Sequence, residues 1–144
     1  MILYLDTSAL VPLLVDEPSS STCGALWDAA SRIATVRLAY VEAAAALAMA
    51  TRLGRLTRLQ HSQARELLDR LWAEIDIIEP DATLTRHAAD ATVDHALRGY
   101  DAMHFSAALA IDAPDLVTAT GDRELLAAWR AVGIATADTN SPAP

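Results

Sequence analysis

Short apolar segments alternate with helical segments along the whole chain, and this alternation constrains the fold more than any other feature. Each apolar segment has about four residues, a length typical of buried strands rather than helices; the segments lie at 2–5, 33–36, 75–78, 115–118 and 134–136. Strands that alternate with helices favour a parallel sheet covered by helices on both faces, with right-handed crossovers. The 144 residues therefore predict one α/β domain over residues 1–139 and a C-terminal tail over residues 140–144.

Helical periodicity fills the intervals between these segments. The clearest helix ends near residue 75, because apolar residues recur there at the spacing of one buried helix face: Ala64, Leu67, Leu68, Leu71, Trp72 and Ile75. Further helices are predicted at about 6–15, 20–30, 38–53, 81–98, 100–111 and 122–132. Gly54 and Gly133 stand where two of them should end. Pro12 is an unfavourable residue inside the first of them, since proline lacks a backbone N–H.

The basic residues are all arginine, and this excludes several classes of enzyme. The absence of lysine rules out five classes of protein that depend on one: phosphate-loop NTPases, Schiff-base enzymes, pyridoxal-phosphate enzymes, protein kinases and response regulators. The single cysteine, Cys23, excludes an internal disulfide and a cysteine-based zinc cluster. The net charge of −8 gives no broad basic surface for nucleic acid. Arg52, Arg55 and Arg58 form either a solvated face or a local surface for a partner or RNA.

The N-terminal residues run directly into the first apolar segment, without the basic region that opens a secretory signal. The longest apolar stretch, at 38–50, is interrupted by Glu42 and is shorter than the roughly 20 residues of a membrane-spanning helix. These observations predict a cytoplasmic protein without membrane association.

Four acidic residues lie where the predicted topology brings parts of the chain together. Asp6 ends the first strand and Asp122 follows the fourth, so both are expected at the same edge of a parallel sheet. Asp101 lies in the first turn of a helix, just after a glycine. Glu42 is the only charged residue of a thirteen-residue apolar stretch, which is expected to be largely buried. A buried carboxylate must be paired, protonated or bound to a metal.

Each acid also has a purely structural interpretation. Asp6 is a favourable helix N-cap, and Asp101 and Asp122 are favoured in first turns by the helix dipole. For Glu42 the structural alternative is a buried ion pair with Arg37 or Arg86.

Taken together, the four acids predict a site for a divalent cation. Carboxylates that converge at one sheet edge repel one another, which would raise at least one pKa, and a cation removes that repulsion. Oxygen ligands suit Mg²⁺ or Mn²⁺ rather than zinc, and such a site can activate water against a phosphodiester. His104 shares a helix face with Asp101 and is either a further ligand or, as we favour, a packed and hydrogen-bonded residue.

Hydroxyl side chains flank two of these acids. Thr7 and Ser8 follow the first strand, Thr118 ends the fourth, and Thr120 lies two residues before Asp122. These hydroxyls either cap helices or hydrogen-bond the carboxylates that would hold the metal.

The chain resembles a PIN-domain ribonuclease of the VapC-like toxin class, which belongs to bacterial type II toxin–antitoxin systems. The resemblance covers essentially the whole chain and rests on the order and spacing of its motifs. They are Tyr4-Leu-Asp-Thr-Ser-Ala-Leu, Glu42, Gly99-Tyr-Asp-Ala-Met-His-Phe-Ser-Ala-Ala-Leu and Leu116-Val-Thr-Ala-Thr-Gly-Asp-Arg-Glu-Leu-Leu. Family members often read Val-Thr-x-Asp after the fourth strand, which leaves both Thr118 and Thr120 as matches; the two-residue spacing to Asp122 favours Thr120.

The resemblance implies a PIN-like three-layer sandwich with a five-stranded parallel sheet of order 3-2-1-4-5. It implies that Asp6, Glu42, Asp101 and Asp122 are catalytic and hold one or two Mg²⁺ or Mn²⁺ ions, supported by Thr7, Ser8 and Thr120. It further implies metal-dependent endoribonuclease activity through in-line attack of metal-bound water on RNA. As a toxin of this class, the protein would inhibit growth unless a cognate VapB-like antitoxin neutralised it, and it would act as a homodimer.

Two other functions compete with this interpretation. A non-catalytic PIN-like interaction module would have the same fold, although retention of all four acids disfavours it. An aspartate-nucleophile phosphohydrolase of doubly wound fold would also place an aspartate at the end of the first strand. That class needs a second aspartate two residues later, where this chain has Ser8.

Overall fold

The computed structural model describes residues 1–141 and has a five-stranded parallel sheet at its centre. The strands are β1 (Ile2–Leu5), β2 (Arg32–Val36), β3 (Asp76–Ile78), β4 (Leu116–Thr120) and β5 (Ala135–Asp138). Their order in the sheet is β3-β2-β1-β4-β5, and every neighbouring pair is parallel. The predicted fold class and strand order are therefore confirmed.

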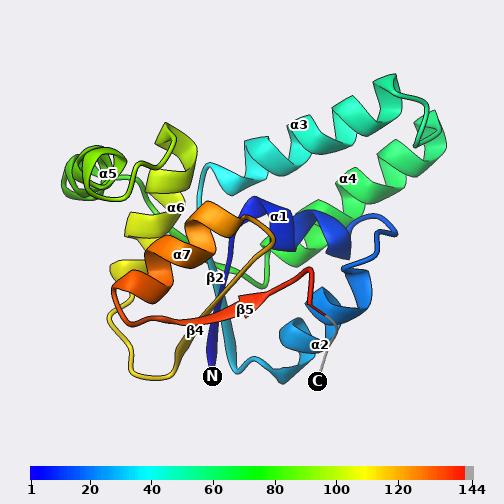
Figure 1. Cartoon of the computed structure of the whole chain (residues 1–144). Helices are drawn as coiled ribbons and strands as arrows, with labels where there is room; N and C mark the ends of the chain where they lie inside the picture. The colour runs from blue at the N-terminus through cyan, green and yellow to red at the C-terminus, as the bar shows by residue number, and fades with distance from the viewer. Residues whose placement is uncertain (142–144) are drawn as a thin grey trace.

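Helices cover both faces of the sheet (Figure 1). One face carries α1 (Thr7–Leu10), the 3-10 helix η1 (Val11–Leu13), α2 (Ser20–Ala29), α3 (Ala39–Arg52) and α4 (Arg58–Trp72). The other carries α5 (Ala82–Asp94), α6 (Gly99–Leu109) and α7 (Arg123–Ala131). In Figure 1, α3 and α4 lie side by side and extend beyond the sheet.

Alternation along β1 divides the hydrophobic core into two layers. Leu3 and Leu5 pack among the helices of the α1–α4 face, and Ile2 and Tyr4 pack among those of the α5–α7 face. This follows from strand geometry, because successive side chains point to opposite faces of a sheet. Tyr4 thereby points toward α6, which carries Asp101.

Two predicted helices are shorter in the structure, for identifiable reasons. The helix expected at 6–15 ends as an α-helix at Leu10 and continues as the 3-10 helix η1, since Pro12 cannot donate the next α-helical hydrogen bond. The helix expected to reach Arg98 ends at Asp94, and Ala96 adopts a left-handed backbone with φ 53°. This early end frees a short loop, which leads into α6 at Arg98.

The apolar helix around Glu42 is less buried than its composition suggests. Only Ala39, Ala43 and Leu47 of α3 are buried, whereas Val41 is 64% exposed and Met49 is 55% exposed. The expectation of a largely buried helix is therefore wrong, because α3 packs on α1, η1 and α4 along one side only.

The last described residues pack near the carboxyl end of β4. Asn140 donates a side-chain hydrogen bond to the Gly121 carbonyl oxygen at 2.9 Å, and Thr22 donates to the Ser141 carbonyl oxygen. The rest of the predicted tail, residues 142–144, lies outside the described residues. In the described part of the chain, no helix is both long and apolar enough to cross a membrane.

Candidate active site

An open cavity of about 480 Å³ lies beyond the carboxyl ends of the strands, and all four predicted acids line it. Asp6 follows β1 directly, and Asp122 caps α7 just after β4. Glu42 comes from the first turn of α3 and Asp101 from the first turn of α6. The parallel topology brings them together because all five strands end at the same edge of the sheet.

Asp6 is the most buried of the four, with 5% of its surface exposed. Its Oδ1 accepts hydrogen bonds from Ser8 Oγ at 2.7 Å and from the Ala9 backbone N–H at 3.1 Å. Its Oδ2 accepts from Thr120 Oγ1 at 2.7 Å. The bond from Ala9 makes Asp6 the N-cap of α1, so its structural role is real and coexists with its place in the cavity.

Thr120, rather than Thr118, contacts the acids. Its hydroxyl donates to Asp6 and accepts from the Asp122 backbone N–H at 2.9 Å, whereas Thr118 Oγ1 lies against the Ala135 carbonyl oxygen. Gly121 has a steric reason to be glycine, since a Cβ there would lie 3.0 Å from Thr139 Oγ1 and 3.2 Å from the Asn140 side chain. Any larger residue between Thr120 and Asp122 would therefore require the Thr139 and Asn140 side chains to shift by a few tenths of an ångström.

Glu42 is held by a chain of side chains from three other elements. Its Oε1 accepts from Thr7 Oγ1 at 2.8 Å and lies 2.8 Å from His104 Nε2. The other ring nitrogen, Nδ1 of His104, lies 2.9 Å from the Tyr4 hydroxyl. His104 is 2% exposed, so it is the packed, hydrogen-bonded histidine that we favoured.

The predicted alternative for Glu42, a buried pair with an arginine, is wrong. Arg37 forms its ion pair with Glu79 at the protein surface. Within residues 1–141, neither Arg37 nor Arg86 contacts Glu42, because α3 turns its first-turn acid toward α6 and α1.

Arg98 joins the remaining two acids at the mouth of the cavity. Its Nε donates to Asp101 Oδ2 at 3.0 Å, and its Nη2 lies 3.8 Å from Asp122 Oδ2. The Arg98 side chain is 77% exposed, so solvent screens these ion pairs. Asp122 also accepts from the Leu125 backbone N–H through Oδ1, which makes it the N-cap of α7.

Burial shifts the pKa values of two groups in this network. It raises the pKa of the Asp6 carboxyl, while the neighbouring His104 imidazole and the hydrogen bonds from Thr120, Ser8 and Ala9 act to lower it. A raised pKa among the acids was predicted, but its main cause is burial rather than mutual repulsion. Burial, followed by the charge of Asp6, also raises the pKa of Tyr4 well above its usual value. Tyr4 therefore retains its proton and is able to donate it in a hydrogen bond.

The donor set fits a hard divalent cation in chemistry but is not gathered around one point. The four acids offer carboxylate oxygens, with hydroxyls beside them, which is the donor set that Mg²⁺ and Mn²⁺ prefer. Among residues 1–141, however, no three acidic, histidine or cysteine side chains converge closely enough to hold a metal ion. Arg98 supplies the positive charge between Asp101 and Asp122 in this arrangement.

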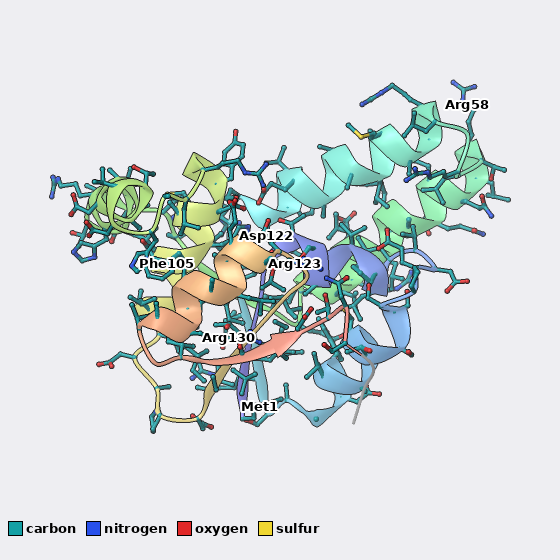
Figure 2. All side chains as sticks on the ribbon, viewed as in Figure 1. Met1, Arg58, Phe105, Asp122, Arg123 and Arg130 are labelled. Carbon is teal, nitrogen blue, oxygen red and sulfur yellow. The ribbon has the colours of Figure 1, made fainter. Side chains whose placement is uncertain are left out.

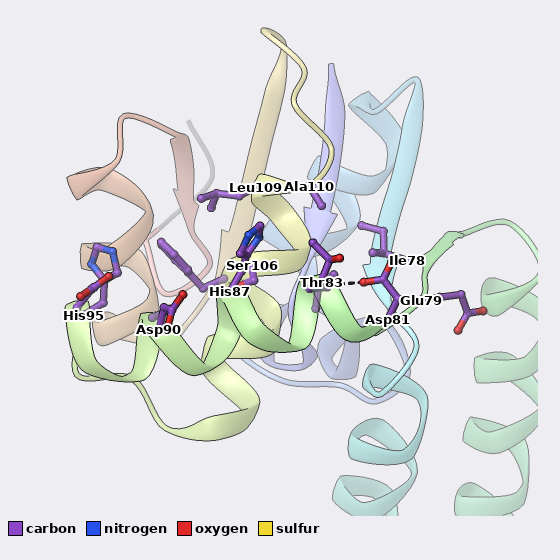
Figure 3. A pocket seen from close by; sticks show the side chains of 14 residues that line it. Ile78, Glu79, Asp81, Thr83, His87, Asp90, His95, Ser106, Leu109 and Ala110 are labelled. Atoms are coloured by element: carbon purple, nitrogen blue, oxygen red, sulfur yellow. Dashed lines mark hydrogen bonds between the residues drawn. The ribbon is translucent and has the colours of Figure 1, made fainter.

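A second cavity, of about 550 Å³, lies between α5 and α6 and contains none of the four acids (Figure 3). Apolar side chains such as Leu84, Phe105 and Leu109 line it, together with Asp81, Asp90 and other acids. Helix α6 contributes to both cavities: Asp101 and His104 line the acid cavity, and Phe105 and Leu109 line the apolar one.

Arg52, Arg55 and Arg58 lie near the connection between α3 and α4. Figure 2 shows Arg58 at the far end of this helical pair, well away from Asp122. These arginines are therefore not part of the acid cavity.

Sequence reasoning missed Tyr4 and Arg98 as neighbours of the acids. Arg98 carried a usable signal, because it lies three residues before Asp101 at the start of the same helix. For Tyr4 the signal was weaker: alternation along the first strand places it on the same face as α6, but nothing local indicates that its hydroxyl meets His104.

Comparisons with known proteins agree with this architecture. The family model described as PIN domain matches residues 3–129. Ribonuclease VapC49 of Mycobacterium tuberculosis is 42% identical over 132 residues, which cover 92% of each chain. The crystal structure of PAE2754 from Pyrobaculum aerophilum matches with a TM-score of 0.70 and 27% identity, covering 96% of this chain and 94% of the other.

One further structure extends the comparison at the level of the fold. Mycobacterium tuberculosis VapC20, described as a Sarcin-Ricin loop cleaving toxin, matches with a TM-score of 0.67 and 19% identity. The match covers 88% of this chain and 94% of that one.

Proposed function

We propose that this chain, which belongs to the PIN-domain family, is an endoribonuclease toxin that hydrolyses phosphodiester bonds in RNA. The observation that carries the proposal is the meeting of Asp6, Glu42, Asp101 and Asp122 at one cavity beyond the strand ends. The 42% identity to a protein named a ribonuclease, over nearly the full length of both chains, supports the choice of RNA as substrate. RNA is made and used in the cytoplasm, so we propose the same compartment for the protein.

We further propose that activity requires Mg²⁺ or Mn²⁺, held by carboxylates of the four acids. The cation would supply charge neutralisation among them and Lewis-acid activation of water and phosphodiester. Thr120 and Ser8 would fix the orientation of Asp6, and Thr7 that of Glu42, through the hydrogen bonds they already make.

Arg98 is suited to binding the RNA backbone at the mouth of the cavity. Among the described residues, Arg98 is the one arginine that lines the acid cavity, and its side chain is largely exposed. A guanidinium that pairs with carboxylates is also able to form two hydrogen bonds to a phosphate. Arg98 would therefore exchange its contacts with Asp101 and Asp122 for contacts with substrate. Because the net charge of the protein is −8, a local cation such as Arg98 is especially important for binding the negatively charged RNA backbone.

The proposed partner is a small antitoxin whose helix docks beside the active site. A groove of about 550 Å³ between the segment that follows η1, the end of α3 and α4 has Leu14, Leu56 and Leu67 among its lining residues. Glu17 lines both this groove and the acid cavity, so the two are adjacent. An amphipathic helix in the groove, followed by an arginine that enters the acid cavity, would match both the apolar and the acidic surface. The homodimer implied by the resemblance stays a prediction, which the molar mass in solution tests.

Purified protein and a single-stranded RNA test the proposed activity. We expect cleavage with Mg²⁺ or Mn²⁺, and none after a chelator has removed the metal. Products with 5′-phosphate ends would agree with attack by water. Absence of cleavage from several unrelated RNAs, in protein that binds Mn²⁺, would instead favour the non-catalytic interaction module.

Growth of a bacterial host tests the proposed toxin and its antitoxin. Expression of the chain should slow growth, and co-expression of the product of the neighbouring gene should restore it. The Asp6→Asn variant is the control, because it should be expressed equally and remain harmless. Normal growth despite verified expression of active wild-type protein would contradict the proposal.

A further inference from the structure

Four residues from four elements form one continuous hydrogen-bonded chain at the back of the acid cavity: Tyr4 in β1, His104 in α6, Glu42 in α3 and Thr7 in α1. We propose that His104 is a positioning residue, which holds Glu42 so that one carboxylate oxygen remains free for the divalent cation. The inference rests on the proposed function, since it assigns His104 a role toward the cation proposed there.

In a neutral imidazole, the two hydrogen bonds of His104 define the tautomer. The Glu42 carboxylate only accepts hydrogen bonds, so the proton between it and His104 belongs to Nε2. In the neutral imidazole this leaves Nδ1 without a proton, so Nδ1 accepts a hydrogen bond from the hydroxyl of the fully buried Tyr4. A hydrogen bond at one imidazole nitrogen thus selects the proton position at the other.

This arrangement occupies one oxygen of Glu42. Oε1 accepts from both Thr7 Oγ1 and His104 Nε2, each at 2.8 Å. Within the described residues, Oε2 takes part in no hydrogen bond, and Glu42 lines the cavity. The side chain is 23% exposed, so an unrestrained glutamate would have room to change rotamer. The two donors therefore remove a conformational freedom that metal binding would otherwise have to remove.

His104 also connects α3 and α6, the two helices that carry Glu42 and Asp101. Asp101 lies three residues before His104 in α6, so the two side chains share a helix face. Through Glu42, the imidazole ties this face to the first turn of α3. Loss of His104 would thus affect the separation of the two helices as well as the orientation of Glu42.

The position of the imidazole argues against a direct ligand role. Both of its nitrogens have partners, and the ring is 2% exposed. Tyr4, its anchor, packs edge-on against the Trp129 ring with centroids 5.8 Å apart. His104 is therefore fixed from the protein interior, behind the acid that it orients.

Mn²⁺ titration by calorimetry tests this role in the purified full chain, without RNA. His104→Leu removes the donor, His104→Gln replaces it with an amide N–H, and Tyr4→Phe removes only the hydroxyl that selects the tautomer. His87→Leu is the matched control, because His87 lines the apolar cavity. Circular dichroism melts identify which variants fold. Long-range ¹H–¹⁵N spectra of the metal-free wild type and Tyr4→Phe report the tautomer of His104.

We expect His104→Leu to weaken Mn²⁺ binding about 10- to 100-fold, the usual effect of losing a group that orients a metal ligand. His104→Gln should retain more affinity than His104→Leu, and His87→Leu should match the wild type. The spectra should show the Nε2–H tautomer in the wild type and a mixture in Tyr4→Phe.

Mn²⁺ affinity within twofold of wild type in folded His104→Leu would overturn the proposal. Equal losses in His104→Gln and His104→Leu would also overturn it, in favour of a direct ligand. If His104→Leu does not fold, an Nδ1–H tautomer in the wild type would refute it instead. None of these measurements uses RNA, so a failure of the proposed ribonuclease activity is distinguishable from a failure of this inference.

Discussion

The two cavities that α6 borders have similar volumes but opposite characters. The acid cavity has carboxylates held by neighbouring hydroxyls, an imidazole and backbone N–H groups. The cavity between α5 and α6 is lined by buried apolar side chains such as Leu84 and Phe105, together with exposed acids such as Asp81 and Asp90. Volume and apolar lining would single out the second cavity as a small-molecule site. Convergent, mutually hydrogen-bonded polar groups single out the first as the place where chemistry is possible.

The two cavities contain two kinds of acidic residue, one buried and held by hydrogen bonds and the other exposed to solvent. Asp6 is nearly buried, and each of its oxygens has a defined donor. Asp90 is an exposed residue that lines the apolar cavity. Both add the same charge to the composition, but only the first is held in a fixed orientation. Substitutions in the two cavities should therefore affect different properties of the protein.

The largest expected effect is on RNA cleavage. Asp6→Asn, Asp101→Asn or Asp122→Asn should each lower kcat by about 10²- to 10⁴-fold, the range for a lost catalytic group. The physical reason is the loss of an anionic oxygen that would hold the cation. Asp90→Asn is the matched control and should retain wild-type cleavage. Full activity of all three variants in a gel-based RNA assay would break the distinction between the cavities.

Substitutions in the apolar cavity should lower stability and leave RNA cleavage unchanged. Leu84 is 6% exposed and packs in the core beneath this cavity. Leu84→Ala should lower the free energy of unfolding by about 2–5 kcal/mol, because it removes buried apolar contacts and enlarges a void. Urea unfolding measures this loss, and cleavage per folded molecule should remain close to wild type. A large loss of specific activity with unchanged stability would show that this cavity takes part in catalysis.

Glu42 sharpens the comparison, because it belongs to the acid cavity yet is only half-buried. Glu42→Gln keeps an oxygen that accepts from Thr7 and His104 and removes the negative charge. We expect the metal-free variant to melt at or above the wild-type temperature, to be inactive, and to gain less from Mn²⁺. For the wild type, Mn²⁺ at 100 times its Kd should add about 2.7 kcal/mol. Thermal melts with and without Mn²⁺ measure both the stability of the metal-free protein and the stabilisation that the metal adds.

A clearly destabilised metal-free Glu42→Gln would mean that the carboxylate charge itself holds α3 and α6 together. In that case Glu42 would be chiefly a structural partner of His104.

The smallest expected effect is a pH dependence of stability without metal. Burial raises the pKa of Asp6 above the ordinary value of 3.8, so the folded state holds this proton to a higher pH than the unfolded state does. Stability should therefore fall as pH rises above about 3.8, until Asp6 is ionised in both states. Each unit by which the pKa is raised corresponds to about 1.4 kcal/mol.

Urea unfolding of the wild type and of Asp6→Asn, over a series of pH values, isolates this contribution. The variant lacks the titrating carboxyl, so its free energy of unfolding should fall less steeply with rising pH than that of the wild type. Equal slopes would mean that Asp6 does not hold its proton more tightly in the folded state. Asp90→Asn again serves as the control and should keep the wild-type slope.

Much of the fold could be predicted from the sequence because its signals are local. Strand and helix periods are repeated over a few residues, and glycines mark the ends of α3 and α7 with φ 74° and 82°. The parallel arrangement then places Asp6 and Asp122 at one edge of the sheet, whatever the details of packing. The early end of α5 and the exposure of α3 were not predictable in this way, because both depend on which neighbours the helices find.

The sequence by itself determined the layered fold, the residues that meet at the strand ends, and the oxygen-rich character of their cavity. Only the tertiary structure decided how those residues are held. Thr120 rather than Thr118 meets Asp6, Arg98 joins Asp101 to Asp122, and Tyr4 reaches Glu42 through His104. His104 lies 100 residues from Tyr4 and 62 from Glu42 along the chain, so no local pattern relates them. A hydrogen bond forms or fails within a few tenths of an ångström, and that precision is set by the packed positions and rotations of whole helices.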